Sequence, residues 1–167
     1  MQNSVTRVEP AHPLLRQIGA IADDVHVEAY VVGGYVRDRL LNLGDKDLDI
    51  LVVGDGVGFA KEVARRLHKE PPVVFERFRT AMIPFETGKV EFVGARKESY
   101  TTSSRKPDVE AGTLEDDLRR RDFTINALAI SLNRETYALL HDPFHGQEDL
   151  QERILRTPLD PEKTFDD

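Results

Sequence analysis

The sequence predicts a mixed α/β fold, in which a short twisted sheet carries helices mainly on one of its faces. Stretches with apolar residues at helical spacing alternate along the chain with short stretches rich in β-branched residues. Gly, Pro or polar residues separate many of these stretches, as expected for elements that pack in layers around one core. The length of 167 residues corresponds to one domain of ordinary size.

The first half of the chain holds most of the expected sheet. Leu14, Leu15 and Ile18 begin a helical apolar stripe, and Gly33-Gly34 ends a buried β-branched stretch. The expected elements are a helix over 12–24, a strand over 27–32, a helix from about Val36 that Gly44 closes, a strand over 46–53, a helix over 57–68, and strands over 73–77, 80–84 and 89–93, the last two joined by a hairpin turn at Thr87-Gly88.

The second half begins with a change in composition. The segment from Arg96 to Gly112 is polar, which predicts a long loop. Thr113 and Asp116 have the spacing of a capping box, so a helix is expected to start there and to run through Leu128. Strands over 129–132 and 137–141 and a short helix over 146–153 follow.

Composition excludes several classes of protein. The absence of cysteine excludes disulfides and thiolate chemistry, and no run of 18 apolar residues is present to span a membrane. The polar start of the chain lacks a signal core, so a cytoplasmic location is expected. The net charge of −7 argues against binding nucleic acid over the whole surface, so nucleic acid is either absent from its function or bound by a local basic surface or by a part outside this chain. The ending Thr164-Phe165-Asp166-Asp167 has no helix-closing Gly, which suggests a truncated chain.

Two aspartates in the segment Asp45-Lys46-Asp47-Leu48-Asp49-Ile50 are the clearest chemical signal. Residues two apart on a strand share a face, so Asp47 and Asp49 are expected to project together. Two close carboxylates stay ionised only beside a cation, and Mg²⁺ is the natural oxygen-binding candidate. The alternative is an edge strand with solvated acids. Asp45 follows Gly44 and is expected to be a turn residue.

A glycine pair lies between the first strand and the next helix. Backbone N–H groups at a helix start bind phosphate, and Gly33 and Gly34 would let the backbone approach it closely. Arg37, one turn later, could bind phosphate with a charge-assisted hydrogen bond. The alternative is a tight turn followed by an exposed arginine.

A basic segment, Arg119-Arg120-Arg121, precedes the apolar residues of the later helix. Arginines here could bind a triphosphate, and Asp122 and Asn126 are expected to share a helix face. The alternative is a solvated helix in which Asp116 and Asp117 pair with Arg120 and Arg121.

Together these segments resemble the family of class II tRNA CCA-adding enzymes and bacterial poly(A) polymerases, within the polymerase β-like nucleotidyltransferases. The resemblance covers about Ala29 to Asp167. It rests on four segments, in order: Val32-Gly33-Gly34-Tyr35-Val36-Arg37-Asp38, Lys46-Asp47-Leu48-Asp49, Arg120-Arg121-Asp122-Phe123-Thr124-Ile125-Asn126-Ala127, and Asp142-Pro143-Phe144-His145-Gly146-Gln147-Glu148-Asp149-Leu150.

The resemblance implies roles for individual residues. Asp47 and Asp49 would hold Mg²⁺, in a two-metal site that Mn²⁺ could also occupy, and Glu91 would be the third carboxylate, which activates the primer hydroxyl. The residues implied to bind nucleotide are Gly33, Gly34, Arg37, Arg120, Arg121, Asp122, Asn126 and Asp167.

Two positions depart from the family pattern. Asp166-Asp167 falls where the base-reading Glu-Asp would lie, with Asp in place of Glu, and the chain ends before the expected Arg. Arg79 stands where similar sequences commonly have Gly.

The resemblance implies a nucleotidyltransferase head over residues 1–140 and a hinge with the start of a truncated neck over 141–167. The implied reaction adds CCA, or part of it, to the 3′ end of tRNA from CTP and ATP, with release of pyrophosphate. Poly(A) synthesis is the nearer alternative, and a non-catalytic nucleotide- or RNA-binding module is the alternative from another class.

Overall fold

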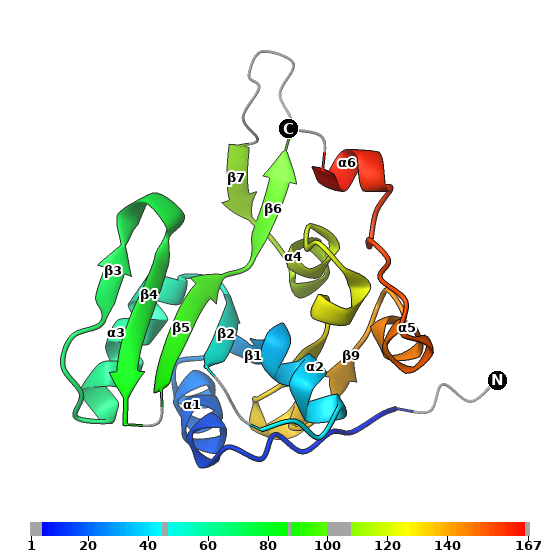
Figure 1. Ribbon diagram of the computed structural model, residues 1–167. Helices are drawn as coiled ribbons and strands as arrows, with labels where there is room; N and C mark the ends of the chain where they lie inside the picture. The colour runs from blue at the N-terminus through cyan, green and yellow to red at the C-terminus, as the bar shows by residue number, and fades with distance from the viewer. Residues whose placement is uncertain (1–4, 45–46, 87, 100–107, 166–167) are drawn as a thin grey trace.

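The computed structural model describes residues 5–44, 47–86, 88–99 and 108–165. Its main feature is a seven-stranded sheet of order β3-β4-β5-β2-β1-β8-β9 (Figure 1). The strands are β1 (Glu28–Val32), β2 (Leu48–Val53), β3 (Val73–Phe75), β4 (Thr80–Phe85), β5 (Gly88–Gly94), β8 (Ala129–Ser131) and β9 (Leu140–His141). The pairing is antiparallel except between β2 and β5, so the predicted mixed sheet is confirmed.

Two long helices cover one face of the sheet, as predicted. The first is α1 (Pro13–Asp24), which begins with a proline, and the second is α3 (Gly56–Arg66), which is capped by the Asp55 side chain. Their apolar stripes pack against inward-facing side chains of the central strands, among them Val31, Ile50 and Phe92. This layer forms the larger hydrophobic core.

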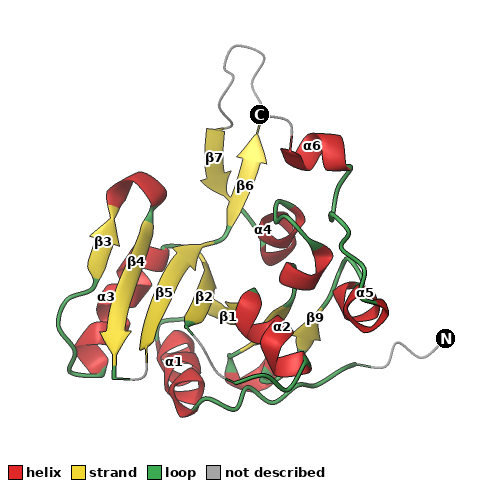
Figure 2. Ribbon diagram, viewed as in Figure 1, coloured by secondary structure: helices red, strands yellow, loops and turns green. Residues whose placement is uncertain are grey.

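The opposite face of the sheet is covered only in part. A smaller cluster there includes Val32 and Leu51 with Leu118 of α4 (Leu114–Arg119). Strand alternation turns Asp49 and Glu91 away from the larger core, toward this second face. Figure 2 shows β4 and β5 without a helix in front of them, beside α4.

The remaining helices are short. They are α2 (Gly34–Leu40), α5 (Gly146–Glu152) and α6 (Pro161–Phe165), with 3-10 turns η1 (Glu76–Phe78), η2 (Thr124–Asn126) and η3 (Arg134–Thr136). Of these, α2 packs into the larger core through Tyr35 and Val36. No helix in the described part of the chain is long and apolar enough to cross a membrane.

The predicted loop over 96–112 was wrong in part. Residues Arg96–Ser99 form β6 and Asp108–Ala111 form β7, an antiparallel pair with Arg96 opposite Ala111. This ribbon extends beyond the end of β5 (Figure 1). Lys97, Glu98 and Glu110 are exposed, so the polar composition reflects a ribbon outside the core and not the absence of strands.

The predicted long helix ending at Leu128 was also wrong. The capping box of Thr113 and Asp116 is present, but α4 ends at Arg119 and η2 follows. The Asp122 carboxylate accepts the N–H of Phe123 at 2.7 Å, a local bond that competes with helical backbone bonds. Asp122 and Asn126 therefore do not share one α-helix, although the Asn126 amide still donates to Asp122 at 3.1 Å.

The helix after the glycine pair is shorter than predicted. It ends at Leu40, and Leu41 and Leu43, which the predicted helix before Gly44 included, lie outside it and are exposed. Asn42 adopts a left-handed φ of 55°, which Asn tolerates better than most residues, so the chain turns before it reaches Gly44.

Candidate active site

Two carboxylates from adjacent strands form the centre of the site. Asp49 on β2 and Glu91 on β5 are direct partners in the parallel register. Glu91 lies between buried Val90 and Phe92, so strand alternation directs its side chain away from the larger core. The same row continues to Val32 on β1 and Met82 on β4.

The electrostatics of this pair favour a cation. Burial and then the Glu91 carboxylate raise the pKa of Asp49, and Asp47 adds to the effect, while Arg121 and Lys89 oppose it. Ionising Asp49 therefore costs free energy in the protein without a bound cation. A bound cation would remove that cost, because opposite charge favours the ionised carboxylate.

Asp47 lies immediately before β2, because β2 begins at Leu48, two residues later than the predicted strand over 46–53. It is exposed, and its Oδ1 accepts the backbone N–H of Lys89 at 3.2 Å. Asp45 lies outside the described residues. Within the described ranges, no group of three or more His, Asp or Glu side chains is placed to hold a metal. Mg²⁺ needs fewer, because it commonly takes one or two protein carboxylates with water and substrate phosphates, so Asp47 and Asp49 fit such an ion.

The glycine turn brings the predicted segments together. Gly33 has φ 73°, a conformation that favours glycine. A Cβ at this position would lie 3.4 Å from Arg121 Nη1 and 3.7 Å from Asp49 Oδ2. The glycine turn, the aspartate strand and the arginine segment, far apart in the sequence, therefore converge on one point.

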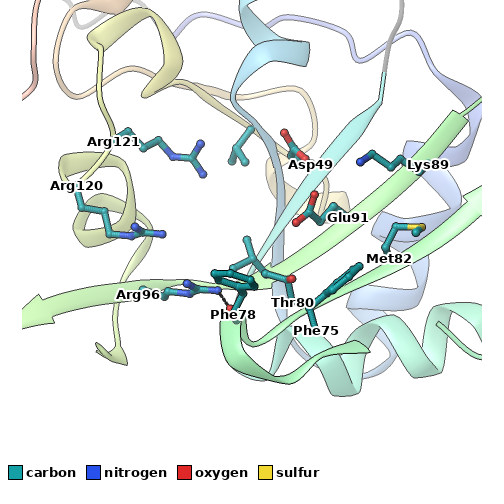
Figure 3. A pocket seen from close by; sticks show the side chains of 12 residues that line it. Asp49, Phe75, Phe78, Thr80, Met82, Lys89, Glu91, Arg96, Arg120 and Arg121 are labelled. Carbon is teal, nitrogen blue, oxygen red and sulfur yellow. Dashed lines mark hydrogen bonds between the residues drawn. The ribbon is translucent and has the colours of Figure 1, made fainter. Parts of the chain in front are cut away.

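A cavity of about 640 Å³ opens over this point (Figure 3). Its charged lining residues are Asp49, Glu91, Lys89, Arg96, Arg120 and Arg121. In Figure 3 the two carboxylates lie on one side, and the guanidinium groups of Arg96, Arg120 and Arg121 lie on the other. Such a division of charge suits a metal-bound polyphosphate, whose anionic oxygens need both metal and arginine.

Arg120 and Arg121 retain unused donors in this cavity. Their Nε atoms are buried and make no hydrogen bond among the described residues, although Arg120 Nε lies 3.5 Å from the Asp117 carboxylate. Buried donors without partners cost free energy. An anionic ligand would supply the missing acceptors.

Arg37 is held beside the cavity and does not line it. Its Nη1 donates to Asn126 Oδ1 at 2.9 Å, and its Nε donates to Asp38 Oδ1 at 3.0 Å. Asn126 in turn donates to Asp122. The predicted nucleotide-binding residues Arg37, Asn126 and Asp122 are thus brought together as one hydrogen-bonded group, and Arg37 is not a free surface side chain.

From the sequence, Asp117 was expected only as an ion-pair partner of arginine on a solvated helix. Its side chain is fully buried. It accepts the N–H of Arg96 at 2.9 Å and lies 3.3 Å from Arg121 Nη2 and 3.5 Å from Arg120 Nε. The alternative pairing with Arg120 and Arg121 is therefore correct for Asp117, but it occurs inside the site and orients both arginines. In the sequence, the signal for these pairs was that Arg120 and Arg121 follow Asp117 by three and four residues, the spacing of neighbours on a helix.

Comparison with known proteins identifies the family. The model of the family described as Poly A polymerase head domain matches residues 29–156, which is more than half of the chain. The chain belongs to the poly(A) polymerase head domain family.

This head domain is similar to several named enzymes. It is 43% identical over 148 residues to the A-adding tRNA nucleotidyltransferase of Geobacter sulfurreducens, covering 88% of this chain and 17% of that protein. It is 42% identical over 143 residues to the CC-adding tRNA nucleotidyltransferase of Deinococcus radiodurans, covering 84% and 37%.

Solved structures agree in fold. An apo form of a CCA-adding enzyme matches with a TM-score of 0.81 at 38% identity, over 92% of this chain and 36% of that chain. A tRNA nucleotidyltransferase complexed with a primer tRNA and an incoming ATP analogue matches with a TM-score of 0.74 at 41% identity, over 85% and 39%. The head domain thus spans well under half the length of each of these relatives.

The segment over 142–150, which lies in the predicted hinge, supports η2. Asp142 accepts the N–H of Gly146 at 2.6 Å and that of Gln147 at 3.0 Å, which fixes the start of α5. Asp149 is buried and accepts the hydroxyl of Thr124 at 2.6 Å. A Cβ on Gly146 would lie 2.2 Å from the Thr124 carbonyl oxygen, so only glycine permits this approach. The motif thereby anchors the turn that carries Asn126.

Arg79 now has a conformational explanation. It adopts a left-handed φ of 52°, at the end of η1, which accounts for the glycine in similar sequences.

Burial lowers the pKa of Arg96, and the nearby charges of Arg120 and, to a smaller extent, Arg79 lower it further, whereas the Asp117 carboxylate raises it. Asp166 and Asp167, predicted to begin the base-reading segment, lie outside the described residues.

Proposed function

We propose that this head domain catalyses nucleotide addition to the 3′ end of tRNA, forming CCA or part of it from CTP and ATP. The observation that carries the proposal is the approach of Gly33, Asp49 and Arg121 to one point, with Glu91 beside Asp49. The named relatives include A-adding, CC-adding and CCA-adding enzymes, which supports the substrate class.

In the proposed reaction the primer 3′-oxygen attacks the α-phosphorus of the nucleotide. The bond from that phosphorus to the bridging oxygen breaks, and pyrophosphate leaves. Glu91 accepts the hydroxyl proton, and Arg120 and Arg121 hold the triphosphate with charge-assisted hydrogen bonds. Asp47 and Asp49 would hold Mg²⁺, which when bound supplies charge neutralisation and lowers the pKa of the attacking hydroxyl.

Poly(A) synthesis by the same carboxylates and arginines is the second candidate, because the family that matches is described by that name. The two candidates differ in product. On tRNA lacking its CCA end, with CTP and ATP supplied together or singly, we expect one to three defined additions resolved by gel electrophoresis. A long A tail would instead identify a poly(A) polymerase, and nucleotide binding without any product would favour the non-catalytic module.

Arg37→Ala is expected to raise the KM for the nucleotide roughly tenfold to a hundredfold, the range for loss of a hydrogen bond to a charged group. The change also removes the partner that holds Asn126. Steady-state kinetics with varied CTP or ATP measures the effect. Arg39→Ala is the matched control, since Arg39 lies on the same helix but donates to the Glu9 carbonyl. An unchanged nucleotide KM in Arg37→Ala would remove Arg37 from the binding site.

A further inference from the structure

Two exposed aromatic side chains line the cavity of the site. Phe75, at the end of β3, is 43% exposed, and Phe78, in η1, is 59% exposed. Of the exposed large apolar side chains in the described part of the chain, only these two line the cavity. Neither belongs to a hydrophobic core cluster, so folding of the described residues does not account for them.

Their position relative to the carboxylates is specific. Gly33 and Arg121 lie on the β1 side of Asp49, whereas Phe75 and Phe78 flank β4, on the far side of Glu91. In Figure 3 the Glu91 carboxylate lies between Asp49 and the two rings. The aromatic pair is therefore on the side of the site where Glu91 would accept the proton of the primer hydroxyl, opposite the triphosphate.

The turn that carries Phe78 is held in place. The Arg96 guanidinium donates to the Phe78 carbonyl oxygen, and the Arg96 backbone N–H donates to buried Asp117. The Arg77 guanidinium carbon lies 5.8 Å from the centre of the Phe78 ring. An aromatic side chain fixed in this way loses little further entropy when a ligand stacks on it.

We infer that Phe75 and Phe78 form the stacking subsite for the base of the primer's 3′-terminal nucleotide. The inference rests on the proposed function and assigns two residues to it. Aromatic side chains bind single-stranded nucleic acid by stacking, which tolerates any base because every base has a π face. Such tolerance suits a primer whose terminal base changes with each addition.

The test uses a double variant, Phe75→Leu/Phe78→Leu, which keeps apolar bulk and removes both aromatic faces. Phe75→Tyr/Phe78→Tyr keeps the faces and is the matched control. Each is assayed on a tRNA primer with its normal terminal base and on the same primer with an abasic terminal nucleotide. Binding of a primer with 2-aminopurine at its 3′ end is followed in parallel by fluorescence.

The wild type and the Tyr variant are expected to have a primer KM roughly tenfold lower with the base than without it, equivalent to about 1.4 kcal/mol. They should also quench 2-aminopurine. The Leu variant should lose both effects, with an unchanged KM for CTP and ATP and an unchanged melting temperature.

A wild type that transfers nucleotide but treats both primers alike would overturn the inference and leave the proposed function standing. An increase in nucleotide KM in the Leu variant would also overturn it, since the rings would then contact the incoming base. A wild type that quenches 2-aminopurine but transfers nothing would overturn the proposed function and keep the stacking site.

Discussion

Asp49→Ala is expected to reduce kcat for nucleotide transfer by about 10²-fold to 10³-fold, the scale of losing one preorganised electrostatic contact to the transition state. Asp49 lies close to Gly33 and Arg121 and is paired with Glu91 in the sheet. In the proposed site, removing it would take away a ligand for Mg²⁺ and a charge beside the triphosphate. Single-turnover assays at saturating Mg²⁺ and nucleotide measure the loss.

Replacing Asp49 is expected to lower activity but to raise the stability of the fold. Because burial and Glu91 raise the pKa of Asp49, the folded protein binds its proton more tightly than the unfolded chain does. The contribution of Asp49 to the stability of the fold therefore falls as the pH rises from the pKa of this carboxyl in the unfolded chain through its pKa in the folded protein. Asp49→Asn, measured in EDTA at pH 7, is expected to have a higher melting temperature than wild type, and the difference should vanish at acid pH.

Glu135→Gln serves as the control, because Glu135 is exposed in η3, away from the cavity. It should alter neither turnover nor stability. Near wild-type turnover in Asp49→Ala would contradict the assignment of the site. A lower melting temperature in Asp49→Asn would instead mean that the ionised carboxylate stabilises the fold without metal.

Asp117→Ala is expected to lower the free energy of unfolding by roughly 3–5 kcal/mol, the cost of removing one partner of a buried ion pair. The change leaves the Arg96 N–H without its acceptor and the guanidiniums of Arg120 and Arg121 without their shared carboxylate. Urea denaturation followed by circular dichroism measures the loss.

Asp116→Ala is the matched control, one residue away and on the surface of the same helix. It removes half of a capping box, which is worth about 1 kcal/mol. If Asp117→Ala does not fold, Asp117→Asn keeps an acceptor oxygen and should fold with a raised KM for nucleotide, because Arg120 and Arg121 lose their orienting charge. Equal stabilities for the Asp116 and Asp117 alanine variants would show that the Asp117 pairs contribute little.

Local patterns in the sequence were enough for most of the fold. The apolar stripe of α1, the alternation in β2 and β5 and the Gly33-Gly34 break each depend on residues a few positions apart. The errors occurred where side chains compete with the backbone or where exposure hides a strand. Asp122 ends the helical pattern because its carboxylate accepts the N–H of Phe123, and the described side chains of β6 and β7 belong to neither core cluster.

The sequence by itself determined local placement in this protein: which strand carries Asp49, which face Glu91 takes, and which segments hold glycine and arginine. Only the tertiary structure decided what lies beside what. Parallel pairing of β2 with β5 makes Asp49 and Glu91 neighbours, burial turns Asp117 into the anchor of two arginines, and the fold of β3 and η1 brings Phe75 and Phe78 to the same cavity. The physical reason is that periodicity fixes the direction of a side chain on its own element, whereas strand order and burial come from long-range packing that no local spacing encodes.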